Sequence, residues 1–307
     1  MRFIDEYRAR FGGVEPICRV LTEHGHKIAP STYYKAKALP PSARAVTDAQ
    51  LLELIRRVHA ANYGVYGARK VWAQLRREGV AVARCTVERL MRQAGLRGVV
   101  RGRRIRTTIA NPDHQRAGDL VRRRFTAAAP NRCWVADFTH VSTFAGVVYV
   151  SFVVDVYSRA IMGWSAATNK RTPLVLDALD MGLWRRDRDG RPAGPGLIHH
   201  SDAGSQYTSF RFTTHLLASG IDASIGTVGD ALDNALMEST IGLYKTELIK
   251  PRRPWRSLAQ VELATAEWVD WYNNHRLHSA LGHRPPAEYE SMFYAHTAPD
   301  QKHLVTA

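Results

Sequence analysis

Three acidic residues, Asp137, Asp202 and Glu238, have the side-chain types and the spacing to bind metal ions together and act as a catalytic triad. Asp137 lies among apolar residues of a predicted strand, where a carboxylate is costly unless it is paired or bound to a cation. Asp202 directly follows the predicted strand LIHHS, and Glu238 lies in the first turns of a predicted helix. Mg²⁺ prefers oxygen ligands and keeps several waters, so a few carboxylates suffice to hold it. The triad therefore predicts two-metal phosphoryl transfer, in which the ions stabilise the attacking and leaving oxygens.

The elements that would position this triad begin after Pro130, where the sequence changes to strands and helices. Strands are predicted over 134–142, 147–156, 161–166, 197–201 and 221–225. Helices are predicted over 173–186 and 208–219, and a long helix is predicted to start near Asp233. Three consecutive strands with tight connections indicate an antiparallel meander. The fold class expected for this part is therefore α/β, a mixed sheet covered by helices.

The positive charge of the chain is concentrated in its first 130 residues, which contain 26 Lys and Arg against 10 Asp and Glu. The remaining residues contain 17 against 18. Within the basic part, YGVYGARKVWAQLRREGVAVARCTVERLMRQAGLRG predicts two short helices joined by a turn at Gly79. This pattern is typical of a small all-α helix-turn-helix region that binds DNA, although an ordinary helical hairpin has the same pattern. The predicted DNA contacts on the polar side of the second helix are Arg84, Thr86, Arg89 and Arg92.

A second basic segment, RGVVRGRRIR at 97–106, has no helical period and is interpreted as a flexible linker that follows phosphates. Its predicted DNA contacts are Arg101, Arg103, Arg104 and Arg106. The predicted domains are an N-terminal helical segment at 1–43, the helix-turn-helix region at 44–96, a basic linker at 97–130, the catalytic core at 131–250, a C-terminal helical extension at 251–290 and a disordered tail at 291–307.

Cysteine usage and hydropathy argue against a secreted or membrane protein. The three cysteines, Cys18, Cys85 and Cys133, are widely separated, so they predict neither a disulfide framework nor a zinc site. The N-terminus MRFIDEYRAR has no apolar core, and the most apolar run, Val147–Val156, is interrupted by polar residues. Such a run is too short to cross a bilayer. We therefore expect a cytoplasmic protein.

Four groups of residues carry a resemblance to a known family. WVADFTHVST, HHSDAGSQYTS, DNALMESTIGLYKTEL and YNNHRLHSALGHRPPAEY, together with the upstream YGVYGARKVW, closely resemble the second-frame transposase (OrfB) of the IS-three family of insertion sequences. The 35 residues between Asp202 and Glu238, with Lys245 seven residues after the glutamate, resemble the DDE signature of transposases and retroviral integrases. The resemblance covers roughly residues 30–290.

The resemblance implies an RNase H-like catalytic core that uses two Mg²⁺ ions, for which Mn²⁺ can substitute. It implies DNA cleavage and strand transfer at the terminal inverted repeats of an insertion sequence, by a copy-out, paste-in pathway that leads to DNA integration. Lys245 would contact DNA near the cut, and Asn234 would help to orient the site and touch the strand. The expected partners are element-end and target DNA, further copies of the chain on DNA, and an upstream-frame (OrfA) helix-turn-helix and leucine-zipper protein, separate or fused by frameshifting. Its expected location is the bacterial cytoplasm, at the nucleoid when bound to DNA.

Two other functions fit parts of the sequence. A non-catalytic DNA-binding regulator would keep the basic region and carry a vestigial triad, and the predicted core would also suit a ribonuclease acting on RNA–DNA hybrids. His199 and His200 adjoin Asp202 on a predicted strand. Because strand side chains alternate, we expect one of these histidines to be buried and the other to lie near the site.

Overall fold

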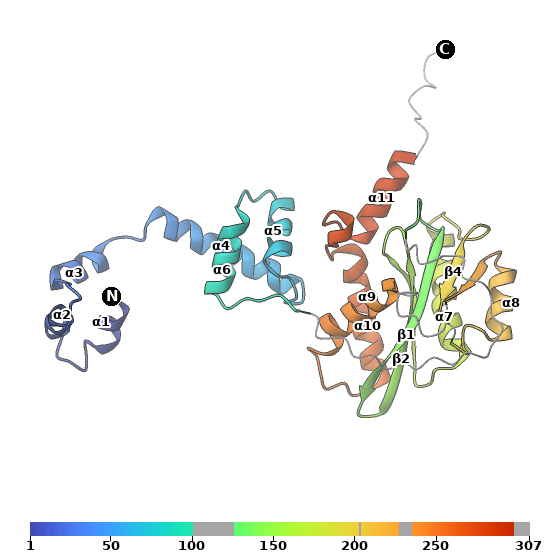
Figure 1. Ribbon diagram of the computed structural model, residues 1–307, viewed down its shortest axis with the longest axis horizontal. Helices are drawn as coiled ribbons and strands as arrows, with labels where there is room; N and C mark the ends of the chain where they lie inside the picture. Colours follow the sequence, from blue (N-terminus) through green and yellow to red (C-terminus); the bar gives the residue numbers. More distant parts are fainter. Residues whose placement is uncertain (101–125, 203, 227–234, 298–307) are drawn as a thin grey trace, which may run out of the picture. The chain divides into compact units, whose positions relative to one another are not determined.

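The computed structural model describes residues 1–100, 126–202, 204–226 and 235–297. The chain divides into two units, Met1–Arg57 and Val58–Ala307, which are described separately (Figure 1). No helix within these described residues is both long enough and apolar enough to cross a membrane.

The first unit consists of short helices around a small core. Its helices are α1 (Arg2–Tyr7), α2 (Val14–Glu23), α3 (Pro30–Ala38) and the first part of α4 (Ala43–Ala61). Ile4, Ile17 and Tyr33 are buried together, and the Tyr33 hydroxyl donates a 2.7 Å hydrogen bond to Asp5. The predicted helical character of this segment is confirmed.

The second unit begins with the two short helices that the sequence predicts. They are α5 (Ala68–Arg77) and α6 (Arg84–Gln93). The turn between them contains Gly79 at φ +81°, a left-handed conformation that glycine adopts without steric cost. Val71 and Leu75 of α5 and Val87 of α6 are buried, so the apolar stripes of the two helices provide their shared core.

A mixed five-stranded sheet forms the centre of this unit. Its strands are β1 (Cys133–Thr143), β2 (Gly146–Asp155), β3 (Ile161–Ala167), β4 (Ile198–Ser201) and β5 (Asp222–Ile225). They lie in the order β3-β2-β1-β4-β5. The first three pair antiparallel, whereas β4 pairs parallel to both β1 and β5. The predicted mixed α/β sheet and its antiparallel meander are confirmed.

Helices cover both faces of this sheet (Figure 1). The helical elements of this part of the chain are α7 (Thr172–Arg188), α8 (Phe210–Ala218), α9 (Ala235–Tyr244), the π-helical turn η1 (Lys245–Ile249), α10 (Leu258–Asn274), the 3-10 turn η2 (Ser279–Leu281) and α11 (Pro286–Thr297). On one face, Trp134 packs with side chains of α7 and α8 in the main core. Helix α7 lies so close to β3 that a Cβ at Gly163 would come 1.9 Å from a backbone oxygen of α7, so only glycine fits there.

The other face of the sheet packs against α9 and α10. The Phe152 ring of β2 lies 5.0 Å from the ring of Tyr244 and 6.2 Å from that of Trp268, measured between centroids. Asp137 pairs directly with Phe152 across the β1–β2 ladder, and directly paired residues share a face. The register therefore places Asp137 on the face that α9 covers.

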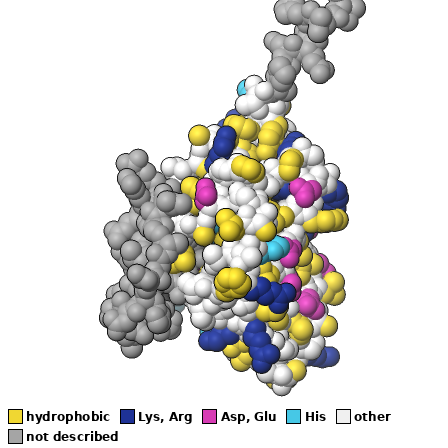
Figure 2. Space-filling model, turned by 90° about the vertical axis from the view of Figure 1, so that its right-hand side faces the viewer, with side chains coloured by type: hydrophobic (Ala, Val, Ile, Leu, Met, Phe, Trp, Pro, Cys, Tyr) yellow, Lys and Arg dark blue, Asp and Glu magenta, His cyan; other side chains and the backbone are white. Residues whose placement is uncertain are grey.

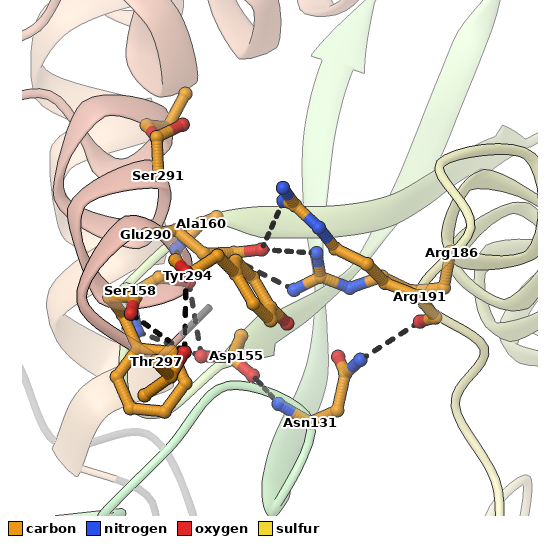
Figure 3. A network of polar contacts seen from close by, with 12 residues as sticks. Asn131, Asp155, Ser158, Ala160, Arg186, Arg191, Glu290, Ser291, Tyr294 and Thr297 are labelled. Atoms are coloured by element: carbon orange, nitrogen blue, oxygen red, sulfur yellow. Dashed lines mark hydrogen bonds and ion pairs between the residues drawn. The ribbon is translucent and has the colours of Figure 1, made fainter. Parts of the chain in front are cut away.

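The prediction that 291–307 is a disordered tail is wrong for Ser291–Thr297, because these residues continue helix α11. Glu290 of this helix forms a buried ion pair with Arg186 of α7, with 2.9 Å between Nη2 and Oε2 (Figure 3). The Arg191 guanidinium stacks 3.8 Å from the Tyr294 ring centroid. These partners are distant in sequence, so the local pattern did not reveal that the helix docks on the core. Residues 298–307 lie outside the described residues.

Charged side chains of both signs are interspersed with hydrophobic ones on the face of the second unit that carries α8 (Figure 2). This agrees with the near balance of charge in residues 131–307, which contain 17 Lys and Arg and 18 Asp and Glu.

Candidate active site

Asp137 lies in the middle of β1, half-buried on the face that α9 covers. The Phe138 backbone N–H donates a 2.7 Å hydrogen bond to its Oδ1 atom. Desolvation is the main reason that the pKa of Asp137 rises to about 8, and the charges of Asp202 and Glu238 raise it further. The Phe138 hydrogen bond and the positive charge of Lys245 act in the opposite direction. A carboxyl with a strongly raised pKa among other acids is typical of a functional site.

Asp202 directly follows β4 and is positioned by the register of two parallel strands. Ala136 of β1 pairs with Ser201 of β4. Because the two strands are parallel, the next residue of each chain segment, Asp137 and Asp202, lies at the same level of the sheet. The Gly204 backbone N–H donates a 3.2 Å hydrogen bond to Asp202 Oδ1, and a Cβ at Gly204 would lie only 3.0 Å from that oxygen. Although the Asp202 residue is exposed, neighbouring groups still remove enough water from its carboxylate to raise its pKa.

Glu238 and Lys245 approach the same site from the helix side. Glu238 is half-buried in the first turn of α9, whose Met237 and Tyr244 side chains are buried. Lys245 begins the π-helical turn that continues α9, and turns of this kind occur often at functional sites. Burial and the nearby Lys250 lower the pKa of Lys245, whereas the charge of Asp137 raises it. The structure thus brings the predicted triad and Lys245 within electrostatic reach of one another.

The three carboxylates do not form a closed metal cage. Among the described residues, no three His, Cys, Asp or Glu side chains are grouped closely enough to hold an ion. The charges of Asp202 and Glu238 both add to the raised pKa of Asp137. A buried carboxyl whose pKa is raised by neighbouring carboxylates lies in a negative potential that is electrostatically suited to a cation.

The two histidines beside Asp202 are both buried, with 1% of each residue exposed, and His200 is the one that lies near enough to the site to act on the charge of Asp202. Strand β4 lies between β1 and β5, and its register places His199 on the face of Trp134 and His200 on the face of Asp137. His199 packs against the Phe212 ring, and burial lowers its pKa to about 4, which keeps it neutral. His200 Nδ1 lies 2.9 Å from Ser224 Oγ, and its charge lowers the pKa of Asp202.

The sequence pattern did not indicate one further residue beside the site. Tyr207, from the loop after β4, is buried, and the charges of Asp137 and Asp202 both help to raise the pKa of its phenol. Its ring also packs against Phe212 and Phe138. The residue stands in HHSDAGSQYTS, but a tyrosine in a Gly-Ser loop carries no periodic signal of burial.

The predicted DNA contacts on α6 lie on its outer side. Arg84 and Arg92 are exposed, and Thr86 and Arg89 are half-buried, while the opposite side of the helix is buried in the core. Arg84 forms a 3.1 Å ion pair with Glu88, one turn further along the helix. The other predicted contacts, Asn234, Arg101, Arg103, Arg104 and Arg106, lie outside the described residues.

The raised pKa of Asp137 predicts a pH-dependent stability in the presence of a chelator. The pKa in the folded chain, about 8, lies above the ordinary value of 3.8, so folding favours the protonated form. The free energy of unfolding should therefore fall as the pH rises from about 4 to about 8. We expect Asp137→Asn to exceed the original chain in stability at pH 8 by on the order of 1 kcal/mol, discounted for solvent screening, and by less at pH 5.

Thermal unfolding followed by circular dichroism, in EDTA at pH 5 and pH 8, measures this difference. Added Mg²⁺ should then raise the melting temperature of the original chain but not that of Asp137→Asn, because a ligand that binds only the folded state stabilises it. Identical melting temperatures for the two chains at pH 8 would show that Asp137 is not held in a repulsive environment.

Comparison with known proteins assigns this chain to a class. Residues 47–104 match the HTH-like domain family, and residues 127–231 and 219–286 match two families described as Integrase core domain. The integrase core defines a DDE-type polynucleotidyl transferase, an enzyme that transfers phosphoryl groups between DNA strands.

Similar proteins identify the particular kind of enzyme. The chain is 57% identical over 268 residues to a putative transposase for insertion sequence element IS986/IS6110 of Mycobacterium tuberculosis, covering 87% of this chain and 96% of that protein. It is 50% identical to the transposase for insertion sequence element IS629 of Shigella sonnei, covering 96% and 97% of the two chains. The chain belongs to the IS-three family of insertion-sequence transposases. The sequence-based predictions of enzyme class and function are thereby confirmed.

A solved structure shows weaker similarity. The catalytic core domain of HTLV-2 integrase in complex with magnesium aligns with a TM-score of 0.40 and 20% identity, covering 53% of this chain and 98% of that domain.

Proposed function

We propose that Asp137, Asp202 and Glu238 are the catalytic metal ligands of this transposase and that they hold two Mg²⁺ ions, which Mn²⁺ can replace. The observation that supports this most is the raised pKa of Asp137, to which both other carboxylates contribute. Three oxygen-donor side chains and no cysteine make a ligand set suited to a hard cation such as Mg²⁺. Bound divalent ions would stabilise the attacking and leaving oxygens of an in-line phosphoryl transfer.

The chain's own groups prepare this chemistry by orienting the carboxylates. The Phe138 N–H holds one oxygen of Asp137 and leaves its Oδ2 atom for a ligand, and the Gly204 N–H does the same for Asp202. Lys245 is half-buried within the electrostatic reach of Asp137, where its ammonium can neutralise a phosphate of the strand that is cut. We assign Asn234, just before α9, to orientation of this strand by family resemblance.

The substrates we propose are the terminal inverted repeats of the element and the target DNA. The predicted boundaries support a division of labour in which 44–96 and the basic linker 97–130 bind DNA while 131–250 cuts it, with 1–43 and 251–290 as helical supports. Two element ends must meet, so we propose that copies of this chain associate on DNA. We further propose that an upstream-frame OrfA protein, separate or fused by frameshifting, assists the pairing in the bacterial cytoplasm.

A nicking assay on a duplex that carries one element end tests this function. We expect a single cut at the 3′ end of the element in Mg²⁺ or Mn²⁺ and no cut in EDTA. Tight binding to the duplex without a metal-dependent cut would favour a regulator instead. Cleavage of the RNA strand in a matched RNA–DNA hybrid, with the DNA duplex left intact, would favour a ribonuclease.

Arg84 and Arg89 of α6 are expected to read bases of the element end. Replacing either with Ala should cost about 1–3 kcal/mol of binding to the element end and less on random DNA, because base contacts exist only on the correct sequence. Fluorescence anisotropy of the full chain on both duplexes measures the two losses. Arg188→Gln, an exposed arginine at the end of α7, is the matched control for loss of one charge. Equal losses on both duplexes would show that the two arginines contact only the backbone.

A further inference from the structure

A pocket of about 530 Å³ lies in the second unit beside helix α9. Leu236, Ser239 and Leu243 of α9 form one side of it, and Tyr272 of α10 also lines it. None of the three triad residues is among its lining residues. Its volume is in the range of pockets that hold small molecules or parts of larger ones, roughly 300–1,000 Å³.

Three cationic side chains from distant parts of the sequence meet in this pocket. Lys70 comes from α5, Arg159 from the turn between β2 and β3, and Arg276 from the loop after α10. Lys70 belongs to YGVYGARKVW and Arg276 to YNNHRLHSALGHRPPAEY. Both motifs contribute to the family resemblance, yet neither supplies a residue to the triad. The fold therefore brings one residue from each of these two motifs to the same pocket.

The charges in the pocket are incompletely balanced. Arg276 donates from Nε and Nη2 to the Glu247 carboxylate at 2.9 and 2.6 Å, so this buried pair is satisfied. Lys70 lies 4.9 Å from the Tyr66 ring centroid, and within the described part of the chain no carboxylate is at ion-pair distance from its ammonium. Burial, with repulsion from Arg276, lowers the pKa of Lys70 to about 7. A half-buried ammonium in such surroundings would be stabilised by an anion.

Arg159 reaches the pocket from an unusual backbone conformation. Its φ is +63°, in the left-handed region where residues other than glycine are uncommon. A tight turn holds it there, because its N–H donates to the Asp155 carbonyl at 2.9 Å and the Ser158 N–H donates to the Asp155 carboxylate at 2.8 Å. Such conformations are strained and cluster at functional and ligand-binding sites.

We propose that this pocket binds one nucleotide of a DNA strand, with its phosphate on Lys70 and Arg159, close to the positive charge of Arg276, and its sugar or base against Leu236, Leu243 and Tyr272. The cations supply charge-assisted hydrogen bonds to phosphate oxygens, and the leucines and tyrosine supply an apolar surface. This inference rests on the proposed function, since it takes DNA as the substrate. A strand anchored here lies against helix α9, which carries Glu238 and continues into the turn that begins with Lys245.

Binding measurements with the full chain test the role of the pocket. Lys70→Met keeps the apolar stem over Tyr66 but removes the charge, whereas Lys70→Arg keeps the charge. On an element-end duplex at 0.1 M salt, we expect Lys70→Met to bind about tenfold more weakly, with a log–log salt slope smaller by about 1. Lys70→Arg should stay near the original chain, and Arg188→Gln should leave both quantities unchanged. If a folded Lys70→Met chain binds the element-end duplex with the affinity and the salt slope of the original chain, the proposal is wrong.

Chemical protection of Lys70 in the original chain gives a second test that needs no variant. An acetylating N-hydroxysuccinimide ester at pH 7.5 modifies accessible amines, and peptide mass spectrometry reads the extent at Lys70. We expect a saturating element-end duplex to protect Lys70 and millimolar dAMP not to do so. Protection by dAMP at concentrations no higher than those of DNA would overturn strand binding in favour of a free-nucleotide site. If Lys70 is acetylated to the same extent with and without bound DNA, the pocket does not bind DNA and the proposal is wrong.

The nicking assay, run on the same samples, separates this proposal from the proposed function. Protection of Lys70 by a duplex that the chain never cuts would uphold the pocket and contradict the catalytic assignment. Metal-dependent nicking with an unprotected Lys70 would contradict only the pocket.

Discussion

Asp137→Asn, Asp202→Asn and Glu238→Gln should each reduce cleavage and strand joining by at least about 10³-fold, while the chain still folds and binds DNA. Each change removes a ligand charge with almost no change of side-chain volume. Asp137 is expected to be the most sensitive, because the other two carboxylates and Lys245 all act on it electrostatically. The measurement is product formation on an element-end duplex in Mg²⁺, with binding followed by anisotropy.

The triad should behave as one unit, so double variants are expected to be scarcely less active than single ones. Asp177→Asn, which removes an exposed carboxylate from α7, is the matched control and should keep the original activity. Near-normal strand transfer by a variant of any one triad residue would remove that residue from the mechanism. Losses that multiply in the double variants would indicate independent roles instead of a shared metal site.

Fusion of this chain to an upstream zipper region should raise the yield of joined element ends by about 10²–10⁴, because linking two binding modules raises their effective concentration. The longest helix among the described residues, α4, has 19 residues, which is fewer than the three to four heptads of a sustained coiled coil. We therefore expect the isolated chain to cut ends competently but to pair them poorly. A plasmid that carries both ends, scored for joined-end products, compares the two proteins.

A fusion whose zipper carries proline substitutions is the control, since it keeps the added length but loses the coiled coil. Its yield should fall to that of the isolated chain. If the isolated chain joins specific ends as efficiently as the intact fusion, this chain carries its own pairing surface and the upstream partner is not needed for pairing.

The order of elements and the candidate triad were accessible from the sequence because both depend on local signals. Strand β1 has a run of buried residues before Asp137 and alternates buried and exposed residues over 139–142, and the apolar run of β2 marks a strand buried in the sheet. Asp202 directly follows the short strand β4, and Glu238 stands at the start of a helix. The spacing of Asp202, Glu238 and Lys245 then resembled the DDE signature of transposases and retroviral integrases, and that resemblance specified the reaction on DNA.

The tertiary structure decided which distant residues meet. The strand order places β4 next to β1, and this adjacency sets Asp202 beside Asp137 and buries both His199 and His200. Helix α11 is ordered because Glu290 pairs with Arg186, 104 positions earlier in the chain. Lys70 and Arg276 line one pocket although more than 200 residues separate them. The periodicity of apolar residues indicates which side of a helix or strand is buried. Which distant residue packs against that side depends on the tertiary packing, which exists only in the folded chain.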